Sequence, residues 1–365
     1  MMRYCFILLL ISSALGLKGQ ELIYDNHIYL DHIKSVKFHI SNLPTSEPII
    51  DLNSSGTLHL TFDDILGGDR DYTYKIIHCD KDWNPSQNIS EMDYLLGFND
   101  EEIRDYEYSS GTIVDYTNYT LEIPNDDMGW RLSGNYILVI TDDESDEVAI
   151  TRRFMVPDRK VSIGSKIIRS TRLNRMLYDQ EIEMWIDNKN YPIGNPQSEL
   201  YITVLQNGRW DNAYTNVQPK VYTGNLITFD RTSRLTFTGY NEFRGIDLRT
   251  FRTRGFGVHS IDIYEDELNY ILQLDEKRSN VLFQNYEDIN GDFLIQSLEY
   301  NNANVRGEYG NTYFTIYSPD QILDGDVYVV GAFTDWQPRD EFRFCLLYTS
   351  PSPRDRTRSR MPSSA

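Results

Sequence analysis

The stretch Tyr201-Ile202-Thr203-Val204-Leu205-Gln206-Asn207-Gly208-Arg209-Trp210-Asp211-Asn212 predicts a β-hairpin. Its first half is rich in β-branched and aromatic residues, which favour extended backbone. Asn207 and Gly208 follow, and this pair is a strong signal for a type I′ turn because both central residues of that turn need a positive φ. The hairpin sets the expectation of a chain built from short antiparallel strands.

Alternation of apolar and polar side chains dominates the rest of the chain. It occurs at residues 58–62, 119–123 and 182–186 and predicts strands with one face in a core. Residues 136–140 are apolar throughout, which predicts a central strand covered on both faces. Further turn signals separate such runs, namely Gly67-Gly68, Gly224-Asn225 and Asn290-Gly291.

Helical patterns are scarce, and the nearest candidate is residues 91–104. Many short strands with regular turns predict an all-β fold of tandem immunoglobulin-like or early-set β-sandwich modules. We expect a first sandwich at residues 20–157, a second at 158–280 and the start of a third, early-set-like sandwich at 281–344. The boundaries are marked by Pro157-Asp158-Arg159 and by the charged run Asp275-Glu276-Lys277-Arg278.

Both ends of the chain differ from the middle in composition. Residues 1–19 combine Arg3 with a short apolar run and predict a secretory signal peptide. Cys5 lies at the start of that run rather than after it, so we expect no lipid anchor. Residues 345–365 carry a net charge of +3 and no strand or helix period. They resemble translated adapter sequence, so we expect this artefactual tail to lie outside the fold and the third module to be cut short.

The chain is acidic, with a net charge of −20 over 365 residues and of −25 once both ends are excluded. Such a chain repels phosphate backbones and anionic lipid headgroups, which excludes nucleic acid as a partner. A hydrophobic content of 40% can supply a core for a chain of this length. Cys79 is the single cysteine between the ends, so packing rather than disulfides must stabilise the fold.

No pattern supports catalysis, a metal site or a cofactor, and we predict that the protein is not an enzyme. His78 and Cys79 are neighbours on a predicted strand and point to opposite faces, which favours a buried structural thiol over a nucleophile. Residues 288–292 begin like a calcium loop but lack its distal ligands, so a turn explains them better. The acidic run 142–147 fits a solvated hairpin tip.

The five tryptophans raise the alternative of sugar binding. Trp185 lies in an alternating strand, so we expect it to pack between sheets. Residues 326–336 resemble the opening of early-set modules of glycogen- and starch-active proteins, which makes Trp336 the strongest candidate for stacking on a sugar. An exported carbohydrate-binding β-sandwich protein is therefore the alternative function.

Two segments, residues 205–212 and 241–244, resemble signature segments of the plug protein family of the type IX secretion system, found in Bacteroidota. Further motifs of that family follow in order at residues 61–65, 74–83, 92–98, 133–136 and 151–156. The candidates for an interface or structural loop in and beside the two segments are Asn207, Gly208, Arg209, Trp210, Asp211, Asn241, Glu242, Phe243, Arg244 and Asp247.

The resemblance implies a periplasmic protein at the inner side of the outer membrane. Its partner would be the giant translocon β-barrel of the type IX system, whose periplasmic opening it would seal while no cargo is engaged. The family brings no catalytic residue and no cofactor to carry over. Carbohydrate remains the alternative ligand.

Overall fold

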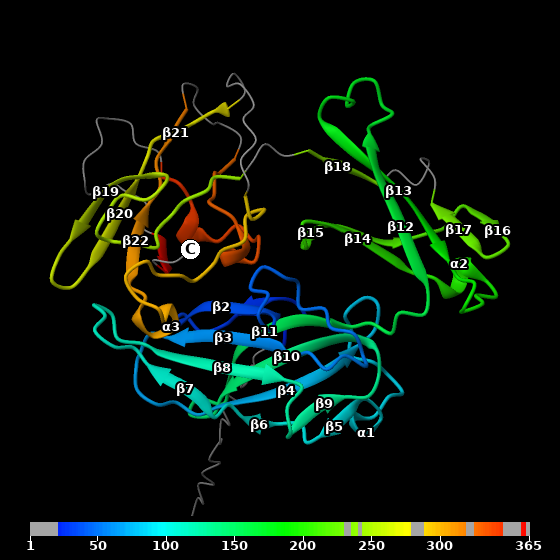
Figure 1. Ribbon diagram of the computed structural model, residues 1–365, viewed down its shortest axis with the longest axis horizontal. Helices are drawn as coiled ribbons and strands as arrows, with labels where there is room; N and C mark the ends of the chain where they lie inside the picture. Colours follow the sequence, from blue (N-terminus) through cyan, green and yellow to red (C-terminus); the bar gives the residue numbers. More distant parts are fainter. Residues whose placement is uncertain are drawn as a thin grey trace, which may run out of the picture.

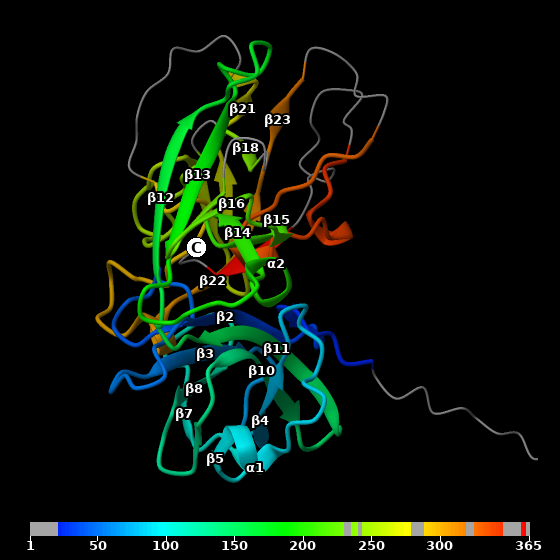
Figure 2. The same cartoon turned by 90° about the vertical axis from the view of Figure 1, so that its right-hand side faces the viewer.

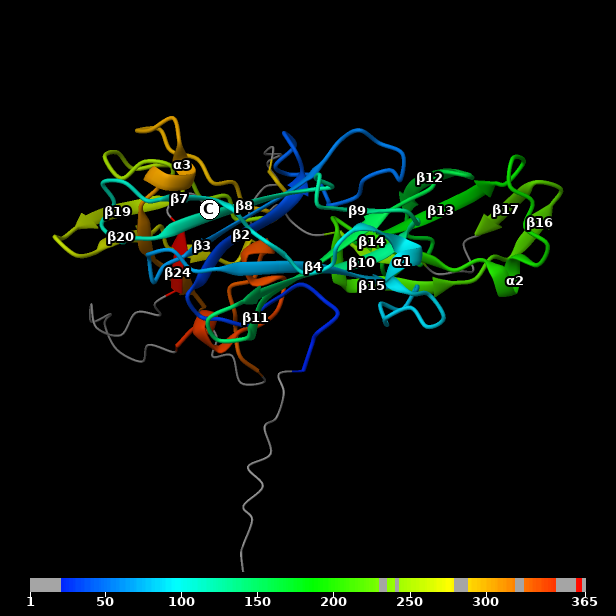
Figure 3. The ribbon, with the colours of Figure 1, turned by 90° about the horizontal axis from the view of Figure 1, so that it is seen from below.

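The computed structural model describes residues 21–229, 235–239, 243–278, 288–318, 325–345 and 359–362. Strands make up 43% and helices 6% of the structure, so the predicted all-β fold is confirmed. Three β modules form a triangle, with module 1 (residues 21–158) below module 2 (159–239) and module 3 (243–345 with 359–362) in Figure 1. Figures 2 and 3 show that modules 2 and 3 lie on the same side of module 1, which runs beneath both.

Module 1 is a sandwich of two antiparallel sheets. The first sheet has the order β1 (His27–Ile28), β11 (Glu147–Val156), β10 (Gly134–Asp142), β4 (Tyr72–Cys79) and β6 (Glu101–Glu102). The second has the order β2 (Ile33–Ile40), β3 (Leu58–Asp64), β8 (Thr117–Ile123) and β7 (Asp105–Tyr108). A short pair, β5 (Leu95–Gly97) with β9 (Met128–Trp130), closes one side.

The core of module 1 follows the predicted alternation. Leu58, Leu60 and Phe62 are at most 1% exposed, and the Phe62 ring stacks on Tyr119 at a centroid distance of 5.1 Å. The predicted helix at residues 91–104 is wrong beyond its first turn, because α1 ends at Tyr94 (Glu91–Tyr94) and β5 follows at once. The local capping bonds of Ser90 support one turn only.

Strand β10 is buried on both faces, as its continuous apolar run predicts. Ile137 and Val139 point to the outer face, where Trp83 and Trp210 contribute to the cluster that covers them. A β-bulge interrupts the pairing of β10 with β11, and Ala149 is the extra residue: Ile140 pairs with Ile150, while Thr141 pairs with Val148.

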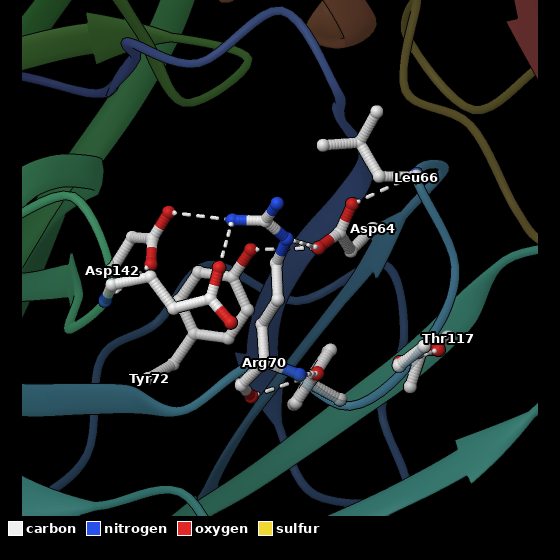
Figure 4. Close-up of polar contacts among 9 residues, drawn as sticks. Asp64, Leu66, Arg70, Tyr72, Thr117 and Asp142 are labelled. Atoms are coloured by element: carbon white, nitrogen blue, oxygen red, sulfur yellow. Dashed lines mark hydrogen bonds and ion pairs between the residues drawn. The ribbon is translucent and has the colours of Figure 1, made fainter.

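Arg70 joins the two sheets of module 1 at one end of the sandwich (Figure 4). Its guanidinium lies 3.5 Å from Asp64 Oδ2, at the end of β3, and 3.2 Å from Asp142 Oδ2, at the end of β10. Both carboxylates are 1% exposed, and a buried carboxylate without a partner is strongly unfavourable. Burial lowers the pKa of Arg70, but Glu144 at 3.1 Å and the two aspartates outweigh it, so the pKa is raised. The Tyr72 hydroxyl donates to Asp64 at 3.0 Å.

Module 2 is a smaller sandwich. One sheet has the order β12 (Ser162–Arg169), β13 (Asp179–Asp187), β17 (Leu226–Phe229) and β16 (Val221–Thr223), with β18 (Thr236–Thr238) also paired to β13. The other is the hairpin β14 (Ile202–Gln206) and β15 (Arg209–Val217), with α2 (Pro196–Glu199) before it. The prediction that Trp185 packs between sheets is wrong: it is 40% exposed, and its ring lies over Gly164 on the outer face.

Module 3 contains a sheet of order β19 (Val258–Ile263), β20 (Leu268–Leu272), β22 (Tyr309–Tyr313) and β24 (Ser359–Pro362). The strands β21 (Asp275–Glu276) and β23 (Ile316–Tyr317) pair in parallel as a separate two-stranded sheet. Its helices are α3 (Ala303–Arg306), η3 (Ala332–Thr334) and η4 (Asp340–Phe342).

Two features of module 3 differ from our expectations. β20 pairs with β22 in parallel, so this sheet contains strands from both sides of position 280, and we propose that the module begins near residue 243. Residues 359–362 of the tail form β24, paired with β22. Residues 326–336 hold no strand; they contain η3 and the isolated bridge of Tyr328 with Arg343.

We predict that Arg70→Ala lowers the free energy of unfolding by about 3 kcal/mol, because it leaves two buried carboxylates without their cation. Denaturant unfolding measures the change. The matched control is Arg104→Ala, whose side chain is 62% exposed and also faces three carboxylates. The control should lose less than about 1 kcal/mol, and equal losses for both variants would show that Arg70 does not stabilise module 1 through Asp64 and Asp142.

Candidate functional site

The predicted hairpin turn points from module 2 onto module 1. Asn207 and Gly208 have φ values of 53° and 69°, as a type I′ turn requires. A Cβ on Gly208 would lie 1.7 Å from Oε1 of Glu47, so a side chain here would displace the Glu47 carboxylate, and the positive φ independently favours glycine. The turn therefore fixes one end of module 2 against the loop that precedes β3.

Next to the turn, Arg153 of module 1 holds an aromatic pair that bridges the modules. Its guanidinium carbon lies 4.4 Å from the ring centroid of Trp83 and 4.8 Å from that of Trp210. The two indoles meet edge to face at 5.2 Å. Arg153 also donates two hydrogen bonds to the Tyr24 carbonyl and pairs with Asp25 at 3.0 Å. Burial lowers the pKa of Arg153, and Asp25 opposes that shift.

A second cation–aromatic contact joins module 2 to module 3. The guanidinium carbon of Arg209 lies 4.1 Å from the ring centroid of Trp336. Asp211 holds this guanidinium with two bonds, of 3.0 and 2.6 Å. Phe243 meets the Trp336 ring edge to face at 5.7 Å, and a Cβ on Gly291 would lie 2.4 Å from the same ring. The indole of Trp336 is thus enclosed by three chain segments.

Arg152 of module 1 provides a contact between module 1 and module 3. It is 6% exposed and lies 3.7 Å from Asp335, the neighbour of Trp336 in sequence. Burial lowers the pKa of Arg152, and Asp335 opposes that shift. Three adjacent pairs therefore interlock: Arg152-Arg153 in β11, Arg209-Trp210 in β15 and Asp335-Trp336 after η3. We call this set the three-module junction.

The backbone is strained at several of these positions. Trp83, Asp335 and Trp336 have φ values of 65°, 51° and 59°, in the left-handed region that bulky side chains rarely adopt. Such conformations persist where the surroundings determine them strongly, and they concentrate at functional positions. Their convergence marks the three-module junction as the candidate functional site.

The other described candidate residues make local contacts within module 3. Arg244 pairs with Asp275 at 2.6 Å, and Asp247 pairs with Arg249 at 2.8 Å. The Phe243 backbone N–H donates to Asp288 at 3.1 Å. Asn241 and Glu242 lie outside the described residues.

The interface candidates predicted from the sequence do not include Arg152, Arg153, Trp83 and Trp336, which complete the junction. Arg152 and Arg153 stand in a strand that is otherwise mostly buried, and two consecutive arginines there are an unusual signal. Trp336 was singled out for sugar stacking, but Arg209 covers one face of its ring. Trp83 follows His78 and Cys79 in a motif that first suggested a thiol site.

A second set of polar contacts ties module 3 to β2 and β3. Asp63 is 5% exposed and accepts hydrogen bonds from Tyr309 at 2.6 Å and from Asn118 at 2.7 Å. Burial raises the pKa of Asp63 to about 6, against the lowering effect of these hydrogen bonds. Lys37 pairs with Asp292 at 2.7 Å. Modules 1 and 3 therefore share a buried polar contact as well as the junction.

The groups that could have supported chemistry serve the fold instead. Burial raises the pKa of the Cys79 thiol to about 12, which leaves it protonated and unreactive. His78 shares a hydrogen bond of 2.7 Å with Ser86. Asp288 accepts from two backbone N–H groups, of Phe243 and Asn290. Within the described ranges, no three His, Cys, Asp or Glu side chains gather as metal ligands do.

Across the part of the chain that the structure describes, no helix is both long and apolar enough to cross a membrane.

The fold and the junction define a class of protein: a scaffold of several β modules, in which the junction residues contact one another across the modules. Residues 33–158 match the family model described as the type 9 secretion system plug protein 1st domain. Module 1 is therefore a plug first domain, and the resemblance to the plug family is confirmed.

A solved structure resembles nearly the whole chain. It is the crystal structure of a hypothetical protein from Parabacteroides merdae ATCC 43184, with a TM-score of 0.86 and 27% sequence identity. The similarity covers 94% of this chain and 85% of that one. No curated protein matches the chain.

We predict that Trp210→Ala loosens module 2 from module 1, since it removes one of the two rings on Arg153, a contact worth about 1–2 kcal/mol. Small-angle X-ray scattering should show a larger radius of gyration, and proteolysis near residues 157–161 should accelerate. Trp185→Ala is the matched control, because Trp185 lies on module 2 outside the junction. An unchanged radius and an unchanged cleavage rate for Trp210→Ala would refute this role.

We predict a pH dependence of stability that comes from Asp63. Its folded-state pKa of about 6 exceeds the unfolded value of 3.8, so its contribution is fully present below pH 3.8 and is lost as the pH rises through 6. Asp63→Asn cannot ionise and still accepts from Tyr309. The free energy of unfolding of this variant, relative to the parent, should therefore rise by up to about 3 kcal/mol between pH 4 and pH 7.5.

The second variant for this test is Tyr309→Phe. It removes a hydrogen bond that lowers the pKa of Asp63, so it should steepen the loss of stability with rising pH. Urea unfolding at several pH values measures both variants. Parallel stability curves for the parent and Asp63→Asn would show that Asp63 does not titrate in this way.

Proposed function

We propose that this protein is a periplasmic plug that binds the giant outer-membrane translocon barrel of the type IX secretion system and seals its periplasmic opening. The match of residues 33–158 to the plug first domain is the observation that carries this proposal. The barrel is the partner, and the site of action is the inner side of the outer membrane. The protein acts by occupying space and carries out no reaction.

The physical need for a seal follows from the partner. A wide barrel with a water-filled lumen leaks small solutes unless something closes it. A stopper must keep its shape under load, and loosely tethered domains do not. The three-module junction and the Asp63 contact hold the three modules to one another through buried charges and cation–aromatic contacts. These contacts support a role as a broad, rigid stopper.

The acidic charge of the chain supports electrostatic steering of its docking to the barrel. The chain has a net charge of −20, and long-range attraction speeds the encounter of an acidic protein with basic patches on its partner. We therefore propose that docking is steered toward basic surfaces of the barrel. Its rate should fall as salt screens the charges.

We predict that the protein lowers the ionic conductance of the purified translocon barrel in a planar bilayer when it is added to the periplasmic side. The paired variant Trp210→Ala with Trp336→Ala should block less, because its modules are no longer held together. Trp185→Ala serves as the control and should block like the parent. A conductance that stays unchanged at saturating protein would rule out the sealing role.

A further inference from the structure

Strand β12 is an edge strand without the proline or the bulge that often blocks an edge. It pairs with β13 over its full length, Ser162 to Arg169, without a register shift, and within the described residues no other strand pairs with it. Alternate residues of an edge strand turn their N–H and C=O groups away from the sheet, which is a template for another strand. β12 contains no proline and no bulge to prevent such pairing.

The other eight-residue edge, β2 (Ile33–Ile40), shows the contrast. Its pairing with β3 is broken by a register shift between Lys34 and Lys37. Module 3 also covers it, through the Ser35–Tyr309 hydrogen bond of 2.6 Å and the Lys37–Asp292 ion pair. The edge strand β2 is thus bulged and covered by module 3, whereas β12 has a regular register and pairs on one side.

β12 also leaves apolar side chains uncovered on the core side of its sheet. Ile163 pairs with Ile186 and Ile167 pairs with Ile182, so both share the face that packs on the β14–β15 hairpin. Both are nevertheless 66% exposed, because the hairpin does not reach across β12. A protected edge would place a charge at such a position. Two exposed isoleucines instead provide apolar area for an added strand.

The charge around this edge is opposite to that of the chain. Residues 159–178 contain six Lys or Arg and no Asp or Glu, in a protein whose net charge is −20. Three of the six pair with aspartates: Arg159 with Asp51, Lys160 with Asp158, and Arg175 with Asp179. The other three are Lys166, Arg169 and Arg172, and all are exposed.

Acidic groups also lie near this edge, but further into the sheet. Glu183 is the cross-strand neighbour of Lys166 on β13. Glu181, also on β13, binds Ser170 and Thr171, and Arg172 lowers its pKa less than those hydrogen bonds do. The border that an incoming strand would meet is therefore basic.

We propose that β12 is a strand-acceptor site that binds an extended, acidic segment of a partner protein. The segment adds to the sheet beside β12 through backbone hydrogen bonds, and its apolar residues cover Ile163 and Ile167. Its carboxylates lie on the opposite face, beside Lys166. Arg169 and Arg172, at and beyond the end of β12, add positive charge to the same border. Backbone pairing supplies affinity, and the alternate side chains supply specificity. A second copy of this chain fits poorly, because pairing two such edges would bring their cations together.

The test is fluorescence anisotropy of labelled peptides with the whole protein. The first peptide, Glu-Val-Glu-Ile-Glu-Val-Glu, alternates acidic and apolar residues, and the second carries Lys in place of each Glu. We expect the acidic peptide to bind at least about tenfold more tightly at 0.05 M salt, a difference of about 1.4 kcal/mol. Equal binding of the two peptides would overturn the proposal.

Two N-methylated forms of the acidic peptide test the strand pairing. One form carries methyl groups on the odd residues and the other on the even residues, so each blocks one edge of the peptide. We expect one form to lose binding and the other to keep it. If both forms bind like the parent peptide, backbone pairing is not the mode of recognition and the proposal fails.

Variants of the protein locate the site. Ile163→Thr with Ile167→Thr keeps β-branched residues in the strand and should weaken the acidic peptide about tenfold. Ile263→Thr, at a 56% exposed position on β19, is the matched control. Equal effects of the two would refute the site, as would a dimer in sedimentation velocity that the β12 variant abolishes. These measurements need no barrel, so their failure is distinct from failure of the sealing role.

Discussion

The arrangement of the modules depends on guanidinium groups that stack on indole rings in partly buried surroundings. Arg153 lies against Trp83 and Trp210, and Arg209 lies against Trp336. A guanidinium suits this position because it is weakly hydrated and planar, so it can face a ring while its edge donates hydrogen bonds. Arg153 does both, since its edge binds the Tyr24 carbonyl and Asp25. Lysine offers no such combination.

These contacts give the hairpin of β14 and β15 a structural role. The turn at Asn207 and Gly208 lies against Glu47, and its neighbours Arg209 and Trp210 each reach a different module. A hairpin with a fixed turn is a precise way to present two adjacent side chains in opposite directions. The hairpin thus joins module 2 to both of the other modules. Module 1 contributes through β11 in the same manner.

Much of the fold could be predicted from the sequence, and little of the junction could. Period-2 patterns located β3, β8 and β13 because burial of alternate residues is a local property, and a continuous apolar run located β10. Trp185 was misplaced because its strand alternates correctly, but among the described residues no second sheet covers the outer face of module 2. The predicted module boundary at residue 280 falls inside one sheet, since β20 and β22 pair in parallel on either side of it. Such a pairing spans a long connection and leaves no local signal in the sequence. Arg209 and Trp336 meet across 127 residues, and no spacing rule reaches that far.

The bulge at Ala149 carries a consequence for the whole architecture. Because of this one extra residue, Arg153 stands opposite Ile137 and Arg152 opposite Leu138. Without it, the pairing of β10 and β11 would shift by one position beyond the hairpin, and Arg152 would take the place opposite Ile137. Arg152, which pairs with Asp335, would then lie beside the tryptophans, and Arg153 would leave that position. The single extra residue thus sets the register of β11, and with it which of the two adjacent arginines contacts Trp83 and Trp210 and which contacts module 3.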